Sequence, residues 1–291
     1  MIFKAMDKSE IISELAAGSR TLVMGIINAT PDSFSDGGKN FHIHAAMQSV
    51  RRMVEAGVDI VDVGGESTRP GSARVDAGLE IARTIPLIKE IAREFPWLAV
   101  SIDTYKAEVA EAAVEAGAAM LNDISALRLD AGLAAVAAGA GIPICIMHML
   151  GTPETMQSNP EYENNVCDEI NAFFKERIAA AVGSGIRMEN IIIDPGIGFG
   201  KTVEHNLEII DRLKEFQVHG RPVLVGASRK SFIGKTLDVE VGDRLEGSIA
   251  AAVISVVNGA GIVRVHDVEE TVRAVRMADA IVRKPSEGVL K

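Results

Sequence analysis

Eight short runs of Val, Ile, Leu, Ala and Met recur along the 291-residue chain, separated by longer segments with apolar residues at helical spacing. Each short run is continuously apolar, which is typical of parallel strands covered by helices on one face and by a packed interior on the other. The predicted strands are residues 22–27, 59–63, 98–102, 118–121, 142–147, 190–193, 222–225 and 261–265. The predicted helices are residues 44–56, 76–94, 106–116, 131–138, 162–182, 203–215, 243–258 and 269–283.

This strict alternation of strands and helices predicts a parallel sheet with right-handed crossovers. Eight strand–helix units in a chain of this length predict an α/β fold, a single (β/α)8 TIM barrel. The alternative is a doubly wound open sheet, which would more often carry a Gly-rich nucleotide-binding turn after its first strand. No stretch of the sequence reads as a linker, so we expect one barrel domain over residues 21–291, preceded by an N-terminal extension of residues 1–20.

Polar side chains follow nearly every predicted strand, whereas the opposite turns carry glycine-based helix C-caps such as Gly57 and Gly117. Barrel enzymes place their active sites at the carboxyl ends of the strands. We therefore expect the active site at that end of this barrel. The strand-end residues able to do chemistry are Asn28, Glu66, Asp103, Asn122, Asp123, His148, Asp194, Arg229, Lys230, Arg264 and His266.

Two carboxylates and an amide in this set suit a flat heterocycle with N–H donors, because an ionised carboxylate only accepts hydrogen bonds. Asp103 could instead cap the following helix, although Thr104 offers an alternative cap. Asn122 could serve a turn. Asp194 precedes a proline and three glycines, which let the backbone approach a ligand closely, and Phe199 in the same loop offers a ring for stacking.

Cationic side chains follow the second, seventh and eighth strands. Arg69 lies in a Gly- and Pro-rich loop, where it could clamp a phosphate or carboxylate or simply pair with Glu66. Lys230 follows the seventh strand, and Arg264 and His266 share a parity at the eighth, so both are expected to point into the barrel. Loops after strands seven and eight of barrels often bind phosphate, which favours a phosphorylated ligand.

The loop after the first strand combines an aromatic residue, Phe34, with Asn28, Asp32 and Asp36. Its proline and glycines set unusual backbone angles. A loop that only reverses the chain seldom needs this set of side chains. We therefore interpret it as part of the active site.

Composition narrows the choice of partners. A net charge of -10 argues against general nucleic-acid or anionic-membrane binding, both of which need a basic face. The uncharged runs 131–147 and 247–263 are broken by Gly, Pro or Asn and read as helix, turn and strand. The first residues lack the apolar core of a signal peptide, so we expect a cytoplasmic protein.

Metal and cysteine signals are weak. Cys145 and Cys167 give neither a disulfide framework nor metal spacing. His42 and His44 have no third ligand nearby in the sequence, and no tetrahedral zinc pattern is present. His148 could bind a metal or hydrogen-bond a neighbour. Mg²⁺ carried in with a diphosphate is compatible with this sequence, because it needs only one or two protein oxygens.

Seven ordered motifs resemble the dihydropteroate synthase family, over residues 21–268 and with no motif missing. They are residues 24–38, Glu66-Ser67-Thr68-Arg69-Pro70-Gly71, Ser101-Ile102-Asp103-Thr104, Asn122-Asp123-Ile124, Asp194-Pro195-Gly196-Ile197-Gly198-Phe199-Gly200-Lys201, Ser228-Arg229-Lys230-Ser231 and Arg264-Val265-His266-Asp267-Val268. The resemblance implies an enzyme that condenses 6-hydroxymethyl-7,8-dihydropterin diphosphate with p-aminobenzoate and releases pyrophosphate. It also implies a homodimer with small-molecule substrates.

The resemblance assigns roles to four groups of residues. It places Asp103, Asn122, Asp194, Phe199 and Lys230 on the pterin; Asn28, Thr68, Arg69, Arg264 and His266 on the diphosphate, with Asn28 also on Mg²⁺; and Phe34, Arg69, Pro70, Phe199 and Ser231 in the p-aminobenzoate pocket, which sulfonamides also occupy. The expected catalytic residues are Asp36, Asp103, Asp194 and Lys230.

The family is thought to react by an SN1-like route, in which loss of diphosphate leaves a cation delocalised into the pterin. Asp103 and Asp194 would stabilise that cation. Asp36, which lies in the first loop, is expected to shield the cation. No protein nucleophile is needed, because the amine of the second substrate attacks. Two alternatives are a methyltetrahydrofolate-dependent methyltransferase, which shares the pterin pocket, and a non-catalytic pterin-binding paralogue.

Overall fold

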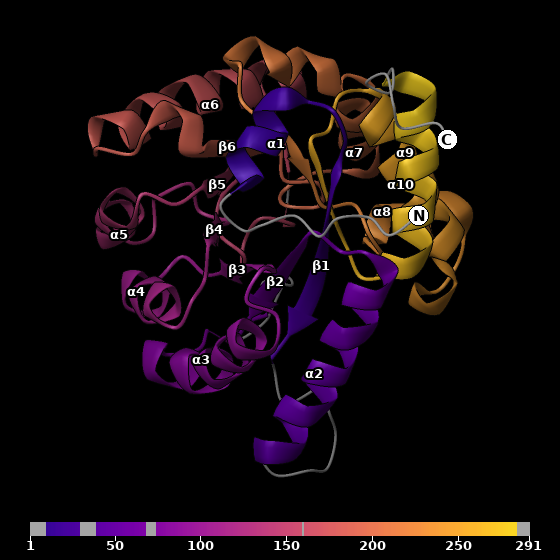
Figure 1. The fold of residues 1–291 in the computed structure, drawn as a ribbon. Coiled ribbons are helices and arrows are strands. Elements are labelled where there is room, and N and C mark those ends of the chain that lie inside the picture. The colour runs from indigo at the N-terminus through magenta and orange to yellow at the C-terminus, as the bar shows by residue number, and fades with distance from the viewer. Residues whose placement is uncertain (1–9, 30–38, 68–73, 159, 284–291) are drawn as a thin grey trace.

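A computed structural model of the chain describes residues 10–29, 39–67, 74–158 and 160–283. In these ranges, eight parallel strands form one sheet in the order β6-β5-β4-β3-β2-β1-β8-β7 (Figure 1). The strands are β1 Leu22–Asn28, β2 Ile60–Gly64, β3 Ala99–Asp103, β4 Met120–Asp123, β5 Ile144–Met147, β6 Ile191–Asp194, β7 Leu224–Val225 and β8 Ile262–Val265. The predicted (β/α)8 barrel is confirmed, and every predicted strand is present.

The barrel closes between its two outermost strands, β6 and β7. One parallel bridge joins Ile193 to Val223, and the Ile193 N–H donates to the Pro222 carbonyl at 3.0 Å. Strand β7 is shorter than predicted, because Pro222 has no N–H to donate to a neighbouring strand. The barrel is therefore nearly closed, with its thinnest seam beside Asp194.

Helices surround the sheet, and all eight predicted helices are present. They are α2 Lys39–Ala56, α3 Ala77–Glu94, α4 Ala107–Glu115, α5 Gly132–Ala140, α6 Val166–Gly183, α7 Val203–Asp211, α9 Leu245–Val257 and α10 Val268–Val282. Two short helices, α1 Ile11–Ala17 and α8 Ser231–Leu237, and three 3-10 turns, η3 Met188–Asn190, η4 Leu213–His219 and η5 Val241–Asp243, were not predicted. The expected strict alternation is therefore wrong after β7, where two helices precede β8.

Helix boundaries also differ from the prediction, and α2 begins at Lys39 instead of residue 44. Helix α6 begins at Val166 instead of residue 162, because the Asn165 side chain accepts from the Cys167 N–H at 2.9 Å and caps the helix there. The predicted helix 203–215 ends as α7 at Asp211, and η4 continues the chain.

The inward side chains of the strands form an apolar floor at one end of the barrel. Helix α1 lies in front of the strands in Figure 1, and its Ile11 is 1% exposed within this floor. The floor consists of Ile11, Leu22, Met24, Ile60, Ala99, Met120, Cys145, Ile192, Leu224 and Ile262. A second apolar cluster between sheet and helices takes the alternate residues, such as Val23, Val61 and Val263. The floor leaves only the opposite, carboxyl end of the barrel for polar side chains.

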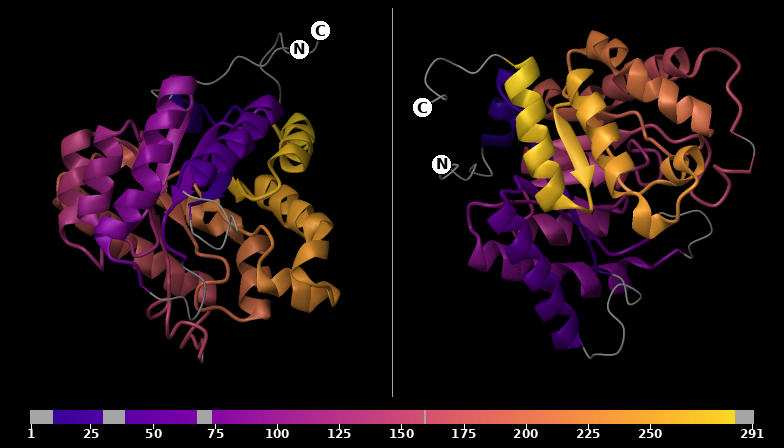
Figure 2. Two further views of the ribbon diagram at one scale, coloured as in Figure 1. Left: turned by 90° about the horizontal axis from the view of Figure 1, so that it is seen from below. Right: turned by 90° about the vertical axis from the view of Figure 1, so that its right-hand side faces the viewer.

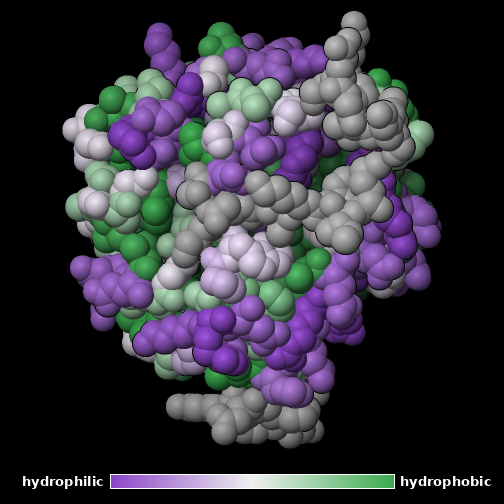
Figure 3. Space-filling view, in the orientation of Figure 1, coloured by the Kyte–Doolittle hydropathy of each residue, from purple (hydrophilic) through white to green (hydrophobic). Residues whose placement is uncertain are grey.

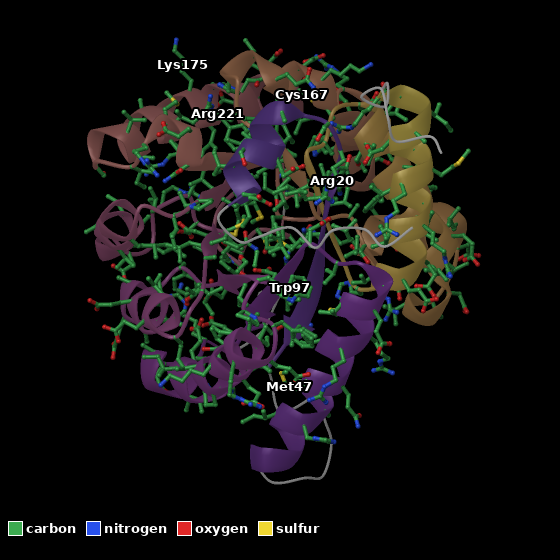
Figure 4. All side chains as sticks on the ribbon, viewed as in Figure 1. Arg20, Met47, Trp97, Cys167, Lys175 and Arg221 are labelled. Atoms are coloured by element: carbon green, nitrogen blue, oxygen red, sulfur yellow. The ribbon has the colours of Figure 1, made fainter. Side chains whose placement is uncertain are left out.

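Polar contacts fasten the two ends of the described chain at the floor. Arg20, labelled in Figure 4, donates to Asp59 at 2.7 Å, and the Thr21 N–H donates to Asp279 of α10 at 2.7 Å. The right-hand view of Figure 2 shows α10 and α9 on either side of β8. These contacts join the two ends of the described chain at the end of the barrel opposite the site.

On the face drawn in Figure 3, hydrophobic residues lie in small groups between hydrophilic ones. None of the helices in the described ranges has the length and apolar character needed to cross a bilayer.

Candidate active site

Toward the carboxyl ends of the strands, the barrel interior changes from apolar to polar. The strand register aligns Asn28 with Gly64, Gly64 with Asp103, and Asp103 with Asn122. Because Gly64 has no side chain, space remains between its neighbours: a Cβ there would lie 3.6 Å from the Asp103 Cβ and 3.9 Å from Asn28 Oδ1. The structure thus brings Asn28, Asp103 and Asn122 to one level of the barrel.

Arg264 on β8 connects this level across the barrel. Its Nε donates to Asp62 Oδ2 at 2.6 Å and its Nη2 donates to Asp103 Oδ2 at 2.7 Å. Asn122 Nδ2 donates to the same Asp62 oxygen at 3.0 Å. The neighbour Val265 belongs to the outer apolar cluster, so the inward direction predicted for Arg264 from strand parity is confirmed.

One guanidinium therefore serves two buried carboxylates. Burial raises the pKa of Asp103 to about 7, although Arg264 lowers it, and the charge of Asp62 raises it further. Burial by itself lowers the pKa of Arg264, but Asp62 and Asp103 outweigh burial and hold that pKa above its ordinary value. The cluster has more negative than positive charge, which favours a ligand that brings N–H donors or develops positive charge.

Asp62 is the residue of this cluster that sequence reasoning missed. It is fully buried, and its Oδ1 has no hydrogen-bond partner among the described residues. Strand parity could have found it: Ile60 lies in the interior floor and Val61 and Val63 in the outer cluster, so position 62 must point inward. A carboxylate at an inward position of a continuously apolar run is itself a signal.

Asp194 and Lys230 form the other side of the site. Asp194 Oδ1 accepts from the Gly196 N–H at 2.7 Å. The Lys230 ammonium donates to the Ile197 carbonyl and lies 4.7 Å from the centre of the Phe199 ring. Burial lowers the pKa of Lys230 to about 8, opposed by Asp194, and burial raises the pKa of Asp194, opposed by Lys230.

The β7–α8 turn directs Lys230 inward and its neighbour outward. Arg229 has φ +57°, its N–H donates to Ser248 Oγ at 2.9 Å, and its guanidinium pairs with Asp267. Ser231, the first residue of α8, is exposed.

His266 follows β8 at the rim. Its N–H lies 3.2 Å from Ser228 Oγ and its Nδ1 lies 3.1 Å from the same oxygen. The end of β7 thereby fixes this imidazole beside the phosphate-binding position expected for barrels.

The alternatives left open for Asp103 and Asn122 can now be compared with the contacts. Thr104 Oγ1 accepts from the Lys106 N–H at 3.2 Å and so stabilises the turn before α4. The Asp103 carboxylate instead accepts from Arg264. Asp123 takes the turn after β4, because it accepts from the N–H groups of Ser125 and Leu127 at 2.7 and 2.5 Å. At the ends of β3 and β4, one residue therefore forms the turn and its neighbour points into the barrel.

Two loops that carry further predicted residues lie partly outside the described ranges. Phe34, Asp36, Thr68, Arg69 and Pro70 all fall there.

At the base of the second loop, Glu66 is bound by Lys106 and accepts from the Tyr105 hydroxyl at 3.1 Å. Lys106 also pairs with Glu80, which is 1% exposed. Glu66 is thus ion-paired with a lysine from the connection between β3 and α4.

His148, left open between metal ligand and hydrogen-bonded residue, has a protein partner. Its Nδ1 lies 3.0 Å from the Nζ of Lys201, a buried residue to which the sequence assigned no role beyond the end of a motif. The His148 ring packs edge-on against Phe173, with 4.8 Å between centroids.

The donors available for Mg²⁺ are few. Over the ranges that the structure describes, no group of three or more His, Cys, Asp or Glu side chains could hold a metal ion. Asn28 ends β1 with an exposed side chain, and an amide oxygen is a ligand that Mg²⁺ accepts. This donor set fits an ion that takes most of its ligands from a diphosphate and water.

Comparisons with known proteins agree with this geometry. Residues 24–266 match the family described as pterin binding enzyme. The chain is 49% identical over 272 residues to a dihydropteroate synthase of Clostridium beijerinckii, covering 93% of this chain and 98% of that protein. A solved dihydropteroate synthase from Clostridium difficile, in the presence of pteroic acid, superposes with a TM-score of 0.86 at 48% identity and covers 92% of this chain and 98% of its own. One from Xanthomonas albilineans with 4-aminobenzoic acid has a TM-score of 0.85 at 42% identity, with coverages of 91% and 94%.

Proposed function

Because the chain belongs to the pterin-binding enzyme family and its relatives there are dihydropteroate synthases, we propose that its strand-end site joins 6-hydroxymethyl-7,8-dihydropterin diphosphate to p-aminobenzoate. The products are 7,8-dihydropteroate and pyrophosphate. The chain is therefore a transferase of folate biosynthesis. A dihydropteroate synthase of Yersinia pestis, at 44% identity, was solved as a sulfonamide drug complex, which supports the proposal that sulfonamides bind this chain as well.

The observation that carries this function is the excess of buried carboxylate around Arg264. A pterin presents several N–H donors along one edge, and Asp103, Asn122 and Asp194 supply acceptors at the level where the barrel floor ends. Neighbouring Lys230 can donate to the pterin carbonyl. This set of acceptors and one donor is complementary to a pterin.

The same charges favour departure of the diphosphate. Breaking the bond between the pterin methylene carbon and the diphosphate oxygen leaves positive charge on the pterin side. Asp103 and Asp194 stabilise that charge in a site where burial has removed water from the carboxylates. The p-aminobenzoate nitrogen then bonds to the methylene carbon and releases a proton.

The leaving diphosphate is bound by Asn28, Thr68, Arg69, Arg264 and His266 in this proposal. The Arg264 Nε and Nη2 groups serve Asp62 and Asp103, so its contact with the diphosphate comes through Nη1. His266 is fixed by Ser228 at the rim. Asn28 would hold Mg²⁺, which when bound neutralises diphosphate charge.

The second substrate is bound by Phe34, Arg69, Pro70, Phe199 and Ser231. Two observations support this pocket. The Phe199 ring has the Lys230 ammonium 4.7 Å from its centre, and Ser231 at the start of α8 is exposed. Asp36 belongs to the first loop and shields the cation when substrates are bound.

The enzyme acts as a cytoplasmic homodimer in this proposal. Helices α7, α8 and α9 pack together and expose Leu207, Leu237, Ile254 and Val257, which suit an apolar interface. Cys145 and Cys167 are unpaired, as thiols are in a reducing compartment. Sedimentation velocity is expected to give twice the chain mass, and a single species of one chain mass would contradict the dimer.

The function is tested by pyrophosphate release from the purified chain. Release is expected only when the pterin diphosphate, p-aminobenzoate and Mg²⁺ are all present, and EDTA in excess should reduce it to background. Dihydropteroate should appear in equal amount. Pterin binding without release would favour a non-catalytic paralogue, and methyl transfer from methyltetrahydrofolate to a corrinoid acceptor would favour the methyltransferase.

A further inference from the structure

The Gly-rich loop between β6 and α7 is fixed by side chains from elements far apart in the sequence. Its glycines 196, 198 and 200 have φ of +70°, +82° and +67°, which other residues rarely adopt. Four successive carbonyls accept from side chains: Ile197 from Lys230, Gly198 from Gln157 at 2.5 Å, Phe199 from Lys201 at 3.0 Å, and Gly200 from Tyr162 at 2.9 Å. The loop that carries Phe199 is therefore held along its whole length.

Lys201 is the unusual member of this set. It is 3% exposed, and its Nζ lies 3.0 Å from His148 Nδ1 and 3.0 Å from the Phe199 carbonyl. Among the described residues, no carboxylate forms an ion pair with it. Burying an ammonium without an ion pair lowers the stability of the folded state, unless hydrogen bonds and nearby charges offset the loss of water.

His148 is built to receive a hydrogen bond from that ammonium. Burial, then the charge of Lys201, holds the pKa of His148 well below its usual range, so the imidazole stays neutral. A neutral imidazole that accepts at Nδ1 carries its proton at Nε2. The end of β5 therefore offers Lys201 an acceptor without competing for its proton.

We propose that Lys201 is a positioning residue for the condensation: its ammonium ties Phe199 to His148 at the end of β5, whose backbone N–H donates to the Asp194 carbonyl at 2.9 Å, and so places a cation near the carboxylate that binds the pterin. This inference rests on the proposed function. It adds a residue that contacts neither substrate but sets the position of one side chain and the charge of another.

The charges around Asp194 and Lys201 support this role. Burial raises the pKa of Asp194, and four groups from three elements oppose it: Lys230, the Gly196 N–H, Lys201 and Arg264. Burial lowers the pKa of Lys201 to about 7, with Lys230 acting in the same direction and Asp194 opposing. The other groups near the pair are Arg128, which acts on His148, and the buried Cys145 thiol, whose pKa Asp194 helps to raise.

The sign of the pH effect follows from these directions. Lys201 is protonated below about pH 7, and there its positive charge opposes the burial that raises the pKa of Asp194. Removing the ammonium raises the pKa of Asp194. The acid limb of activity then moves to higher pH.

A Lys201→Met variant tests the proposal, because Met is unbranched, uncharged and only one heavy atom shorter than Lys. The acid limb of kcat/KM for the pterin diphosphate should move up by about one pH unit, and KM for p-aminobenzoate should rise roughly tenfold, the effect of losing one positioning contact. Lys175→Met is the matched control: Lys175 is exposed on α6 and labelled in Figure 4, and this variant should keep the wild-type profile.

A second pair of variants covers the case in which Lys201→Met does not fold. His148→Leu removes the acceptor and should move the acid limb in the same direction, whereas His148→Gln keeps an acceptor and should leave it near the wild-type position. An acid limb unmoved in Lys201→Met, or the same in His148→Leu and His148→Gln, would overturn the proposal. A wild-type chain without pyrophosphate release would instead overturn the proposed function.

Discussion

An Asp194→Asn variant is expected to lose roughly a hundredfold in affinity for a pterin, the equivalent of about 3 kcal/mol for a hydrogen bond to a charged group. The carboxylate only accepts, whereas the amide would turn N–H donors toward the donors of the ligand. The fold should survive, because the amide oxygen can still accept from the Gly196 N–H, which lies 2.7 Å from Asp194 Oδ1. The loss therefore measures recognition and not unfolding.

Calorimetric titration with a pterin gives the affinity directly. Wild-type affinity should fall as acid protonates Asp194, whose pKa burial raises, while the affinity of Asp194→Asn should be weak at every pH. An Asp36→Ala variant serves as the contrast: it should keep pterin affinity and lose turnover at saturating substrate. Equal affinities of Asp194→Asn and wild type would refute the role of Asp194, and wild-type turnover in Asp36→Ala would refute the shielding role.

An Arg264→Met variant is expected to lose about 3–5 kcal/mol of unfolding free energy at neutral pH, because it leaves buried carboxylates without their cation. Asp62 is fully buried and Asp103 has a side-chain exposure of 10%, so neither can reach water instead. Urea unfolding monitored by circular dichroism measures the loss.

The loss should depend on pH in a defined direction. Burial already raises the pKa of Asp103 to about 7, and removing Arg264 raises it further. A carboxyl whose pKa is raised on folding destabilises the folded state as pH rises above its unfolded value of about 4. The deficit should therefore be largest at neutral to alkaline pH and shrink as pH falls toward 4.

Two further variants make the comparison specific. Adding Asp103→Asn to Arg264→Met should recover part of the stability, because it removes one uncompensated charge. Arg273→Met breaks an exposed pair with Glu269 and should change stability by no more than about 0.5 kcal/mol. A deficit in Arg264→Met that is small or independent of pH would show that the shared cation has no such role.

Most of the barrel could be predicted because its signals are local. Continuous apolar runs located all eight strands, and the helical spacing located the eight long helices. The errors concern elements set by other parts of the chain. Helix α1 has seven residues, and its Ile11 is buried only because it meets the inward residues of the strands. Helix α8 follows the left-handed Arg229, which Ser248 of a later helix holds in place.

The site divides in a similar way. The rule that chemistry follows the carboxyl ends of strands found Asp103, Asn122, Asp194, Lys230, Arg264 and His266. It missed Asp62, which lies two residues before the end of β2, and Lys201, which lies seven residues beyond the end of β6. Both contact partners distant in the sequence: Arg264 for Asp62, and His148 for Lys201.

The sequence by itself therefore determined the barrel, the end at which its site lies, and the acceptors and cations that gather there. Periodicity and strand parity carry that information, since they specify where each side chain points along its own element. Only the tertiary structure decided which charges share a partner. Arg264 is divided between two carboxylates, and Lys201 is buried against a neutral imidazole. Closure of the barrel sets these distances and this burial, and no local pattern encodes them.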